Sequence, residues 1–236
     1  MNDEVRARLD EVAAADARLR RTAQALDEPG LRAPSLCEGW TRGHVLAHVA
    51  LNAHSLVNLM EWARTGVEQP QYPSWEEREA DIERFATRGP DEHVAALDEA
   101  STAFRGAATR LPSERWDFEV RGIGGDPQPV SGFLFGRLRE VEIHHVDLDA
   151  GYGSSDWDDA FVAKVLGQVP ERLGPGVAVP FVAEASDLDA VVRVGEDSAA
   201  AHVRGPGHLL LAWLLGRSDG SGLEHDGALP AVPGWG

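Results

Sequence analysis

Residues 136–152 read GRLREVEIHHVDLDAGY and form the most informative part of the chain. They predict a helix over about 130–150, because apolar residues recur there at helical spacing. Glu140 and His144 are four residues apart, so they share one face of that helix about one turn apart. A carboxylate and an imidazole placed in this way can bind one metal ion, or they can form an ordinary charge pair.

Three further long helices are predicted upstream, over about 3–27, 41–64 and 90–111, from apolar residues at spacings of three and four. Thr41 is the predicted N-cap of the second of these helices, and Gly66 follows its end. The loop 66–90 is expected to hold a short helix over 74–86, and glycines make 112–128 a hairpin-like loop. Four long helices with apolar stripes favour an antiparallel bundle.

After Gly151 the pattern changes to shorter elements. We expect Asp156 to cap a helix over 157–173, short strands near 177–182, 188–194 and 199–203, and a helix from Pro206 to Arg217. The tail from residue 218 is expected to be coil. The predicted fold is therefore mainly α, with a four-helix bundle over 1–152 and a small C-terminal α+β domain over 153–236.

Composition limits the function classes. The 236 residues carry 22 Lys and Arg against 39 Asp and Glu, a formal net charge of −17, which disfavours nucleic acid and anionic membranes as partners. A single cysteine, Cys37, excludes an internal disulfide. The start of the chain lacks the apolar core of a signal peptide, and no apolar run reaches the ~20 residues of a membrane span. These features predict a cytoplasmic protein.

His48 lies on the second predicted helix and can add a second imidazole to Glu140 and His144. Two histidines and one carboxylate with an open fourth position are typical of catalytic zinc. Spacing alone leaves this open, because Glu-x-x-x-His is common as a surface charge pair. Four competing side chains also lie on these two helices, namely His44, His54, Glu142 and His145.

Three stretches resemble the mycothiol-dependent maleylpyruvate isomerase family: GWTRGHVLAHVALNAHSLVNLMEWARTG (39–66), EWARTGVEQPQY (61–72) and REVEIHHVDL (139–148). The resemblance covers nearly the whole chain. It implies a DinB-like metal-binding four-helix bundle followed by a small α+β domain. It also implies that His48, Glu140 and His144 bind the metal, Zn²⁺ or another divalent ion. The segment GRSDG (216–220) places the family's catalytic arginine at Arg217, and Arg78 is a second candidate.

The reaction that the resemblance implies is the cis–trans isomerisation of maleylpyruvate to fumarylpyruvate, in aromatic degradation of the gentisate type. Mycothiol would supply a metal-activated thiolate that adds to the double bond, allows rotation and then leaves. Arginine would stabilise the enolate and attract the anionic substrate. The oligomeric state and the residues that bind the mycothiol sugar are not predicted.

Three other functions remain open at this point: a mycothiol S-transferase on the same metal site, a non-catalytic metal-binding DinB-like module, and a hydrolase that uses metal-bound water. Cys37 is expected to be a half-buried structural residue. Asn52 is expected to pack in the core. Asp147 is a candidate to accept the second ring N–H of His144.

Overall fold

The computed structural model describes residues 2–173, 179–195 and 201–232. The chain divides into two compact units, Met1–Gly151 and Tyr152–Gly236. The two helices expected to carry the metal ligands, at 41–64 and 130–150, both fall within the first unit.

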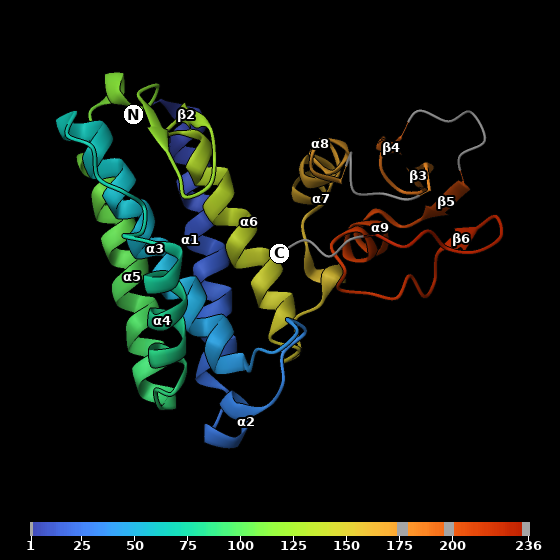
Figure 1. Ribbon diagram of the computed structural model, residues 1–236, viewed down its shortest axis with the longest axis horizontal. Helices are drawn as coiled ribbons and strands as arrows, with labels where there is room; N and C mark the ends of the chain where they lie inside the picture. The colour runs from blue at the N-terminus through green and yellow to red at the C-terminus, as the bar shows by residue number, and fades with distance from the viewer. Residues whose placement is uncertain (1, 174–178, 196–200, 233–236) are drawn as a thin grey trace. The chain divides into compact units, whose positions relative to one another are not determined.

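The first unit is a bundle of four long helices, as the apolar stripes predict (Figure 1). The helices are α1 (Asp3–Gln24), α3 (Arg42–Thr65), α5 (Pro90–Arg110) and α6 (Gly132–Asp147). Helix α3 packs against α5 and α6, and α1 packs against α5 and α6. The shorter α4 (Trp75–Ala86) packs on α3. The mainly helical fold is confirmed.

Local capping explains where α3 begins and ends. The Thr41 side chain accepts a hydrogen bond from the backbone N–H of His44, and the His44 ring accepts one from Thr41 N–H. Gly66 ends the helix at φ 76°, a left-handed conformation that costs glycine little. Both limits agree with the sequence prediction.

Two connections in the first unit carry structure of their own. No helix was predicted directly after the first one, but α2 (Glu28–Arg32) begins there, with Asp27 as its N-cap. Its proline lies in the first turn, where a helix accepts proline. The predicted hairpin-like loop contains η1 (Ser113–Arg115) and the antiparallel strands β1 (Glu119–Arg121) and β2 (Pro127–Pro129).

A buried polar network ties the helices of the bundle together. Arg137 is 1% exposed and donates to the Val49 carbonyl, to Asn52 Oδ1 and to Asp16 Oδ1. Ser101 donates to the second oxygen of Asp16. Buried charges are tolerated when they are paired in this way. The network joins α1, α3, α5 and α6, and it gives the polar side chains of Asp16 and Asn52 partners within the bundle.

The second unit is a four-stranded sheet with helices. The strand order is β4 (Val191–Val194), β3 (Phe181–Ala185), β5 (Ala201–Gly205) and β6 (Glu224–His225), with β3 and β5 parallel. The helices are η2 (Ser154–Asp156), α7 (Asp159–Leu166), α8 (Val169–Leu173) and α9 (Gly207–Leu214).

Four details of this unit differ from the sequence predictions. Asp158, and not Asp156, caps α7, and the expected helix over 157–173 is divided into α7 and α8. Helix α9 ends at Leu214, before Arg217. The tail expected to be coil contributes β6, which pairs with β5. The predicted strand residues 177–178 and 199–200 lie outside the described residues.

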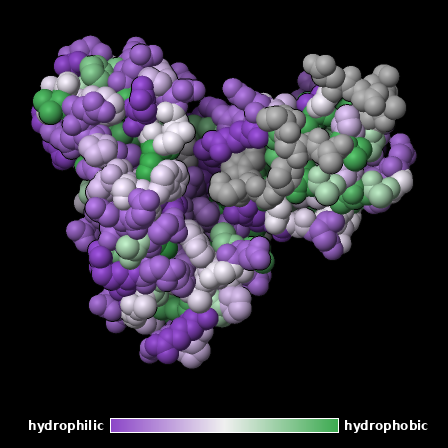
Figure 2. Space-filling model, viewed as in Figure 1, coloured by the Kyte–Doolittle hydropathy of each residue, from purple (hydrophilic) through white to green (hydrophobic). Residues whose placement is uncertain are grey.

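Hydrophilic side chains dominate the outer surface of the bundle in the view of Figure 2, in keeping with the charge of −17. None of the helices in the described part of the chain combines the length and apolar content needed to cross a bilayer.

Candidate metal centre

Three side chains converge inside the bundle from two helices. His48 on α3 has its Nε2 atom 2.8 Å from Glu140 Oε2 on α6. His144, one turn further along α6, has its Nε2 atom 3.6 Å from the same oxygen. The two imidazole rings meet edge to face with centroids 4.6 Å apart. The structure therefore brings together His48, Glu140 and His144, the ligand set that the resemblance implies.

The arrangement fits a divalent metal. One nitrogen of each histidine and one oxygen of Glu140 lie within 4.8 Å of one another. Tetrahedral zinc with ligand bonds of about 2.0–2.1 Å separates its ligand atoms by ~3.3 Å. The observed separations of 2.8 and 3.6 Å bracket that value. Two imidazoles and a carboxylate are also ligands that zinc and other divalent ions accept.

Burial differs among the three residues. The side chain of His48 is 5% exposed and that of His144 is 15% exposed, whereas the Glu140 side chain is 28% exposed. Glu140 is therefore the most exposed of the three, and the two imidazoles are held in the protein.

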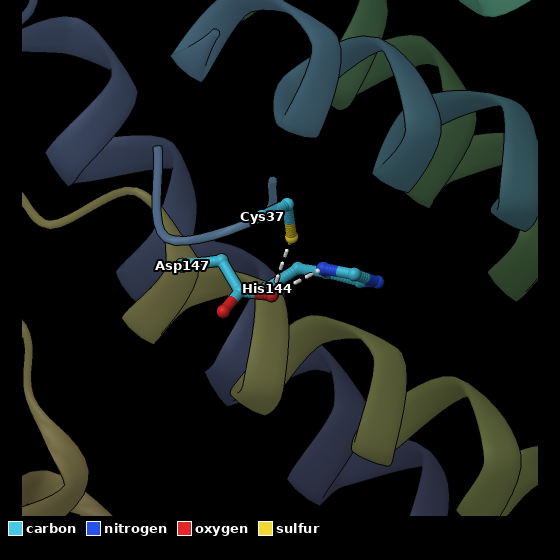
Figure 3. Close-up of side chains that lie close together, drawn as sticks. All are labelled: Cys37, His144 and Asp147. Carbon is cyan, nitrogen blue, oxygen red and sulfur yellow. Dashed lines mark hydrogen bonds and ion pairs between the residues drawn. The ribbon is translucent and has the colours of Figure 1, made fainter. Parts of the chain in front are cut away.

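A buried carboxylate orients the His144 ring through Nδ1, the nitrogen that does not face Glu140. Its Nδ1 atom lies 2.8 Å from Asp147 Oδ2, and Asp147 is fully buried. Histidine ligands usually place their second ring N–H on such an acceptor, because that fixes the tautomer and the ring orientation. Figure 3 shows the carboxylate between the His144 ring and the Cys37 thiol, whose Sγ atom is 3.1 Å from the same oxygen.

His48 has a different environment at its second nitrogen. Arg78 on α4 places Nη2 3.1 Å from His48 Nδ1. The Arg78 guanidinium also lies near the Tyr72 and Trp75 rings, at 5.8 and 5.5 Å from their centroids. Trp40 contacts the other side of His48, with ring centroids 5.5 Å apart. A guanidinium that lies near aromatic rings and a candidate metal ligand is well placed to bind an anionic molecule.

Electrostatics separate the roles of the two histidines. Burial and the nearby charge of His144 lower the pKa of His48 to about 4. Burial also opposes the charged form of His144, but hydrogen bonds with Asp147, Cys37 and Glu140 outweigh it and raise the His144 pKa well above its ordinary value. Burial favours neutral Glu140, yet its contacts with both histidines lower the Glu140 pKa well below its ordinary value. In the absence of metal, His144 is therefore protonated and positively charged at neutral pH, whereas His48 is neutral and Glu140 is ionised.

Three of the four competing side chains have partners elsewhere. His44 lies 3.3 Å from Glu83, and His145 lies 2.7 Å from the Thr22 hydroxyl. Glu142 pairs with Arg18. His54 is half-buried on α3 and belongs to none of the possible metal-binding groups among the described residues.

Arg217 lies in the second unit, in the turn after α9. It is half-buried, and its Nη1 atom donates to the Leu215 carbonyl at 2.7 Å. Its role in catalysis stays a prediction.

Trp40 and Tyr72 also lie near the candidate ligands, and neither was among the site residues predicted from the sequence. Trp40 directly precedes the N-cap Thr41, so its place beside the first turns of α3 could have been inferred from the cap. Tyr72 lies in the connection before α4, and no local pattern indicates that its ring would approach Arg78.

Comparison with known proteins identifies the family. The family model described as "Mycothiol maleylpyruvate isomerase N-terminal domain" matches residues 12–149. A crystal structure of the mycothiol-dependent maleylpyruvate isomerase is 28% identical in sequence, with a TM-score of 0.92. The similarity covers 98% of this chain and 97% of the crystallised chain. A histidine-to-alanine mutant of that enzyme matches with the same values. No curated protein matches the chain. Family and structures together support an isomerase.

Proposed function

Because the chain belongs to the family of mycothiol maleylpyruvate isomerase N-terminal domains, we propose that it catalyses the mycothiol-dependent conversion of maleylpyruvate to fumarylpyruvate. The observation that carries the proposal is the convergence of His48, Glu140 and His144 within a chain that matches the solved isomerase over almost its full length. The metal-binding module would be the domain 1–152.

The chemistry requires a thiolate at neutral pH. A divalent ion held by His48, Glu140 and His144 would supply it, because a thiol that coordinates such an ion is deprotonated. Asp147 would keep the Nε2 atom of His144 directed at the ion by accepting the Nδ1–H. Glu140 is ionised, so it contributes negative charge to the ligand set without first losing a proton.

The substrate requires a positive charge that persists during the reaction. Its cis double bond is conjugated to carbonyl groups, and it becomes a single bond when sulfur adds to it, which permits rotation. Negative charge then develops on an enolate oxygen. Arg78 can donate to the enolate or to a carboxylate from its place beside His48. We assign Arg217 the same kind of role by resemblance. A guanidinium stays charged at every working pH and binds planar anions with two donors.

A turnover assay with maleylpyruvate, with and without mycothiol, tests the proposal. Formation of the trans acid should require mycothiol, and chelation should abolish it. His48→Ala and Glu140→Gln should each lose bound metal and activity together. His54→Ala is the matched control on α3, and it should keep both.

Other outcomes would separate the alternatives. Accumulation of a sulfur conjugate would indicate an S-transferase, and thiol-independent hydrolysis of a substrate would indicate metal-bound water as the nucleophile. Purified protein that takes up no divalent metal would contradict the proposal at its first step.

A further inference from the structure

The carboxylate behind His144 has two hydrogen-bond donors. Asp147 Oδ2 lies 2.8 Å from His144 Nδ1 and 3.1 Å from Cys37 Sγ. Asp147 has no exposed surface, and a buried carboxylate is costly unless donors satisfy it. One of these donors belongs to a metal-ligand candidate, and the other comes from the connection between α2 and α3 (Figure 3).

Hydrogen bonds of the backbone around Cys37 hold its thiol next to Asp147. Leu36 N–H donates to the Asp147 carbonyl at 2.9 Å, and Cys37 N–H donates to the Ser35 hydroxyl at 3.1 Å. Arg42, at the start of α3, donates to the Leu148 carbonyl at 2.5 Å. The segment that carries Cys37 is therefore tied to the C-terminal end of α6 on both sides of the thiol.

Cys37, His144 and Asp147 also lie close enough together to hold a metal of their own. The chemistry of His144 argues for hydrogen bonds instead. A neutral histidine that binds a metal through Nε2 carries its ring proton at Nδ1, so this nitrogen does not bind a second metal. The separations of 2.8 Å to His144 Nδ1 and 3.1 Å to Cys37 Sγ are those of hydrogen bonds to the Asp147 carboxylate. Nδ1 of His144 is thus a donor, and Nε2 is left to face Glu140.

We propose that Cys37 is a positioning residue of the metal centre. Its S–H holds the Asp147 carboxylate in the orientation that accepts His144 Nδ1–H, and so keeps His144 Nε2 directed at the metal. This inference rests on the proposed function, because it takes His48, Glu140 and His144 as the metal ligands. It assigns Cys37 a role in metal affinity, where the sequence alone indicated a structural residue.

Metal affinity is the measurement that tests the proposal. The dissociation constants of Zn²⁺ and Co²⁺ would be measured by competition with a chelator for the full-length chain and its variants. Asp147→Asn should weaken binding about 10–100-fold, the range for a partner of a metal-bound histidine. Cys37→Ala should weaken it by about tenfold, at the lower end of that range. Cys37→Ser keeps a donor and should restore affinity close to that of the unchanged protein.

Two further readouts separate positioning from general stability. The visible absorption of bound Co²⁺ should change in Cys37→Ala and return in Cys37→Ser, because it reports the geometry around the ion. Leu36→Ala is the matched control: it changes the adjacent side chain and keeps the backbone bond to Asp147, so it should bind metal normally. Thermal unfolding of the metal-free variants shows whether each is folded. If Asp147→Asn does not fold, the comparison of Cys37→Ala with Cys37→Ser still tests the proposal.

The outcomes that overturn the inference are distinct from failure of the proposed function. Equal metal affinity and equal Co²⁺ spectra in Cys37→Ala and the unchanged protein would refute it. A second bound metal that is lost in Cys37→Ala would assign the cluster as a metal site, which also refutes it. Absence of metal binding in the unchanged protein would refute the proposed function itself.

Discussion

Metal binding should release about one proton per ion, and this number should stay constant between pH 5.5 and 6.5. A metal ligand must be deprotonated, so uptake of metal displaces any proton that the site holds. The His48 pKa of about 4 leaves this residue neutral in that range, and Glu140 is ionised there. His144 has a raised pKa and carries the proton that is displaced.

Two ordinary imidazoles would behave differently. With a pKa of about 6.5 each, they would together release ~1.8 protons at pH 5.5 and ~1 at pH 6.5. Zinc-bound water with a pKa of about 7 adds ~0.2 proton at pH 6.5 but only ~0.03 at pH 5.5, so the count at pH 5.5 is the decisive one. Titration calorimetry in buffers of different ionisation enthalpy measures the proton count. A value near 1.8 at pH 5.5 would refute the assigned charges, and a value near zero would refute the raised His144 pKa.

Three further predictions concern other parts of the chain. Arg137→Ala should destabilise the fold by about 3–5 kcal/mol, because it leaves the Asp16 carboxylate buried without its cation. The double variant Arg137→Met, Asp16→Leu should recover most of that stability, and chemical denaturation measures both. Gly43→Ala should lower the free energy of unfolding by about 1–3 kcal/mol, since its Cβ would lie 2.5 Å from a backbone oxygen of α4, whereas Gly136→Ala meets nothing within 4 Å and should not destabilise the protein. Arg217→Ala should keep its metal yet turn over ~10²–10³-fold more slowly, and unchanged turnover would remove it from the mechanism.

The helices of the first unit were predictable because their signals are local. Thr41 and Gly66 mark the two ends of α3 within the helix's own sequence. Helix α2 was missed because Pro29 indicates the end of one helix as readily as the first turn of another. The short strand β6 was missed because two residues are too few to show a strand pattern, and only their pairing with β5 defines the strand.

The metal centre depends on contacts between residues distant in the sequence. His48 and Glu140 are 92 residues apart, and no spacing rule joins them; the family resemblance paired them. The resemblance did not assign a role to Cys37, which reaches Asp147 across 110 residues. Asp16 and Arg137 are likewise 121 residues apart, so no local pattern indicates their contact. Each of these contacts requires the packing of α6 against its neighbours.

The two histidines of the candidate site differ in their partners at Nδ1, and this difference would link metal binding by His48 to Arg78. The guanidinium has only donors, so His48 Nδ1 accepts from it, and the ring proton is then at Nε2, facing Glu140. A neutral histidine that binds metal through Nε2 carries its proton at Nδ1. On His48 this N–H would face the N–H of the Arg78 guanidinium, so two donors would point at each other. His144 has no such conflict, because Asp147 is an acceptor. A metal on His48 therefore opposes the contact with Arg78. Metal binding and release of the Arg78 guanidinium would therefore be coupled, because both favour the His48 tautomer that carries its proton at Nδ1. The released guanidinium would then bind an anionic substrate.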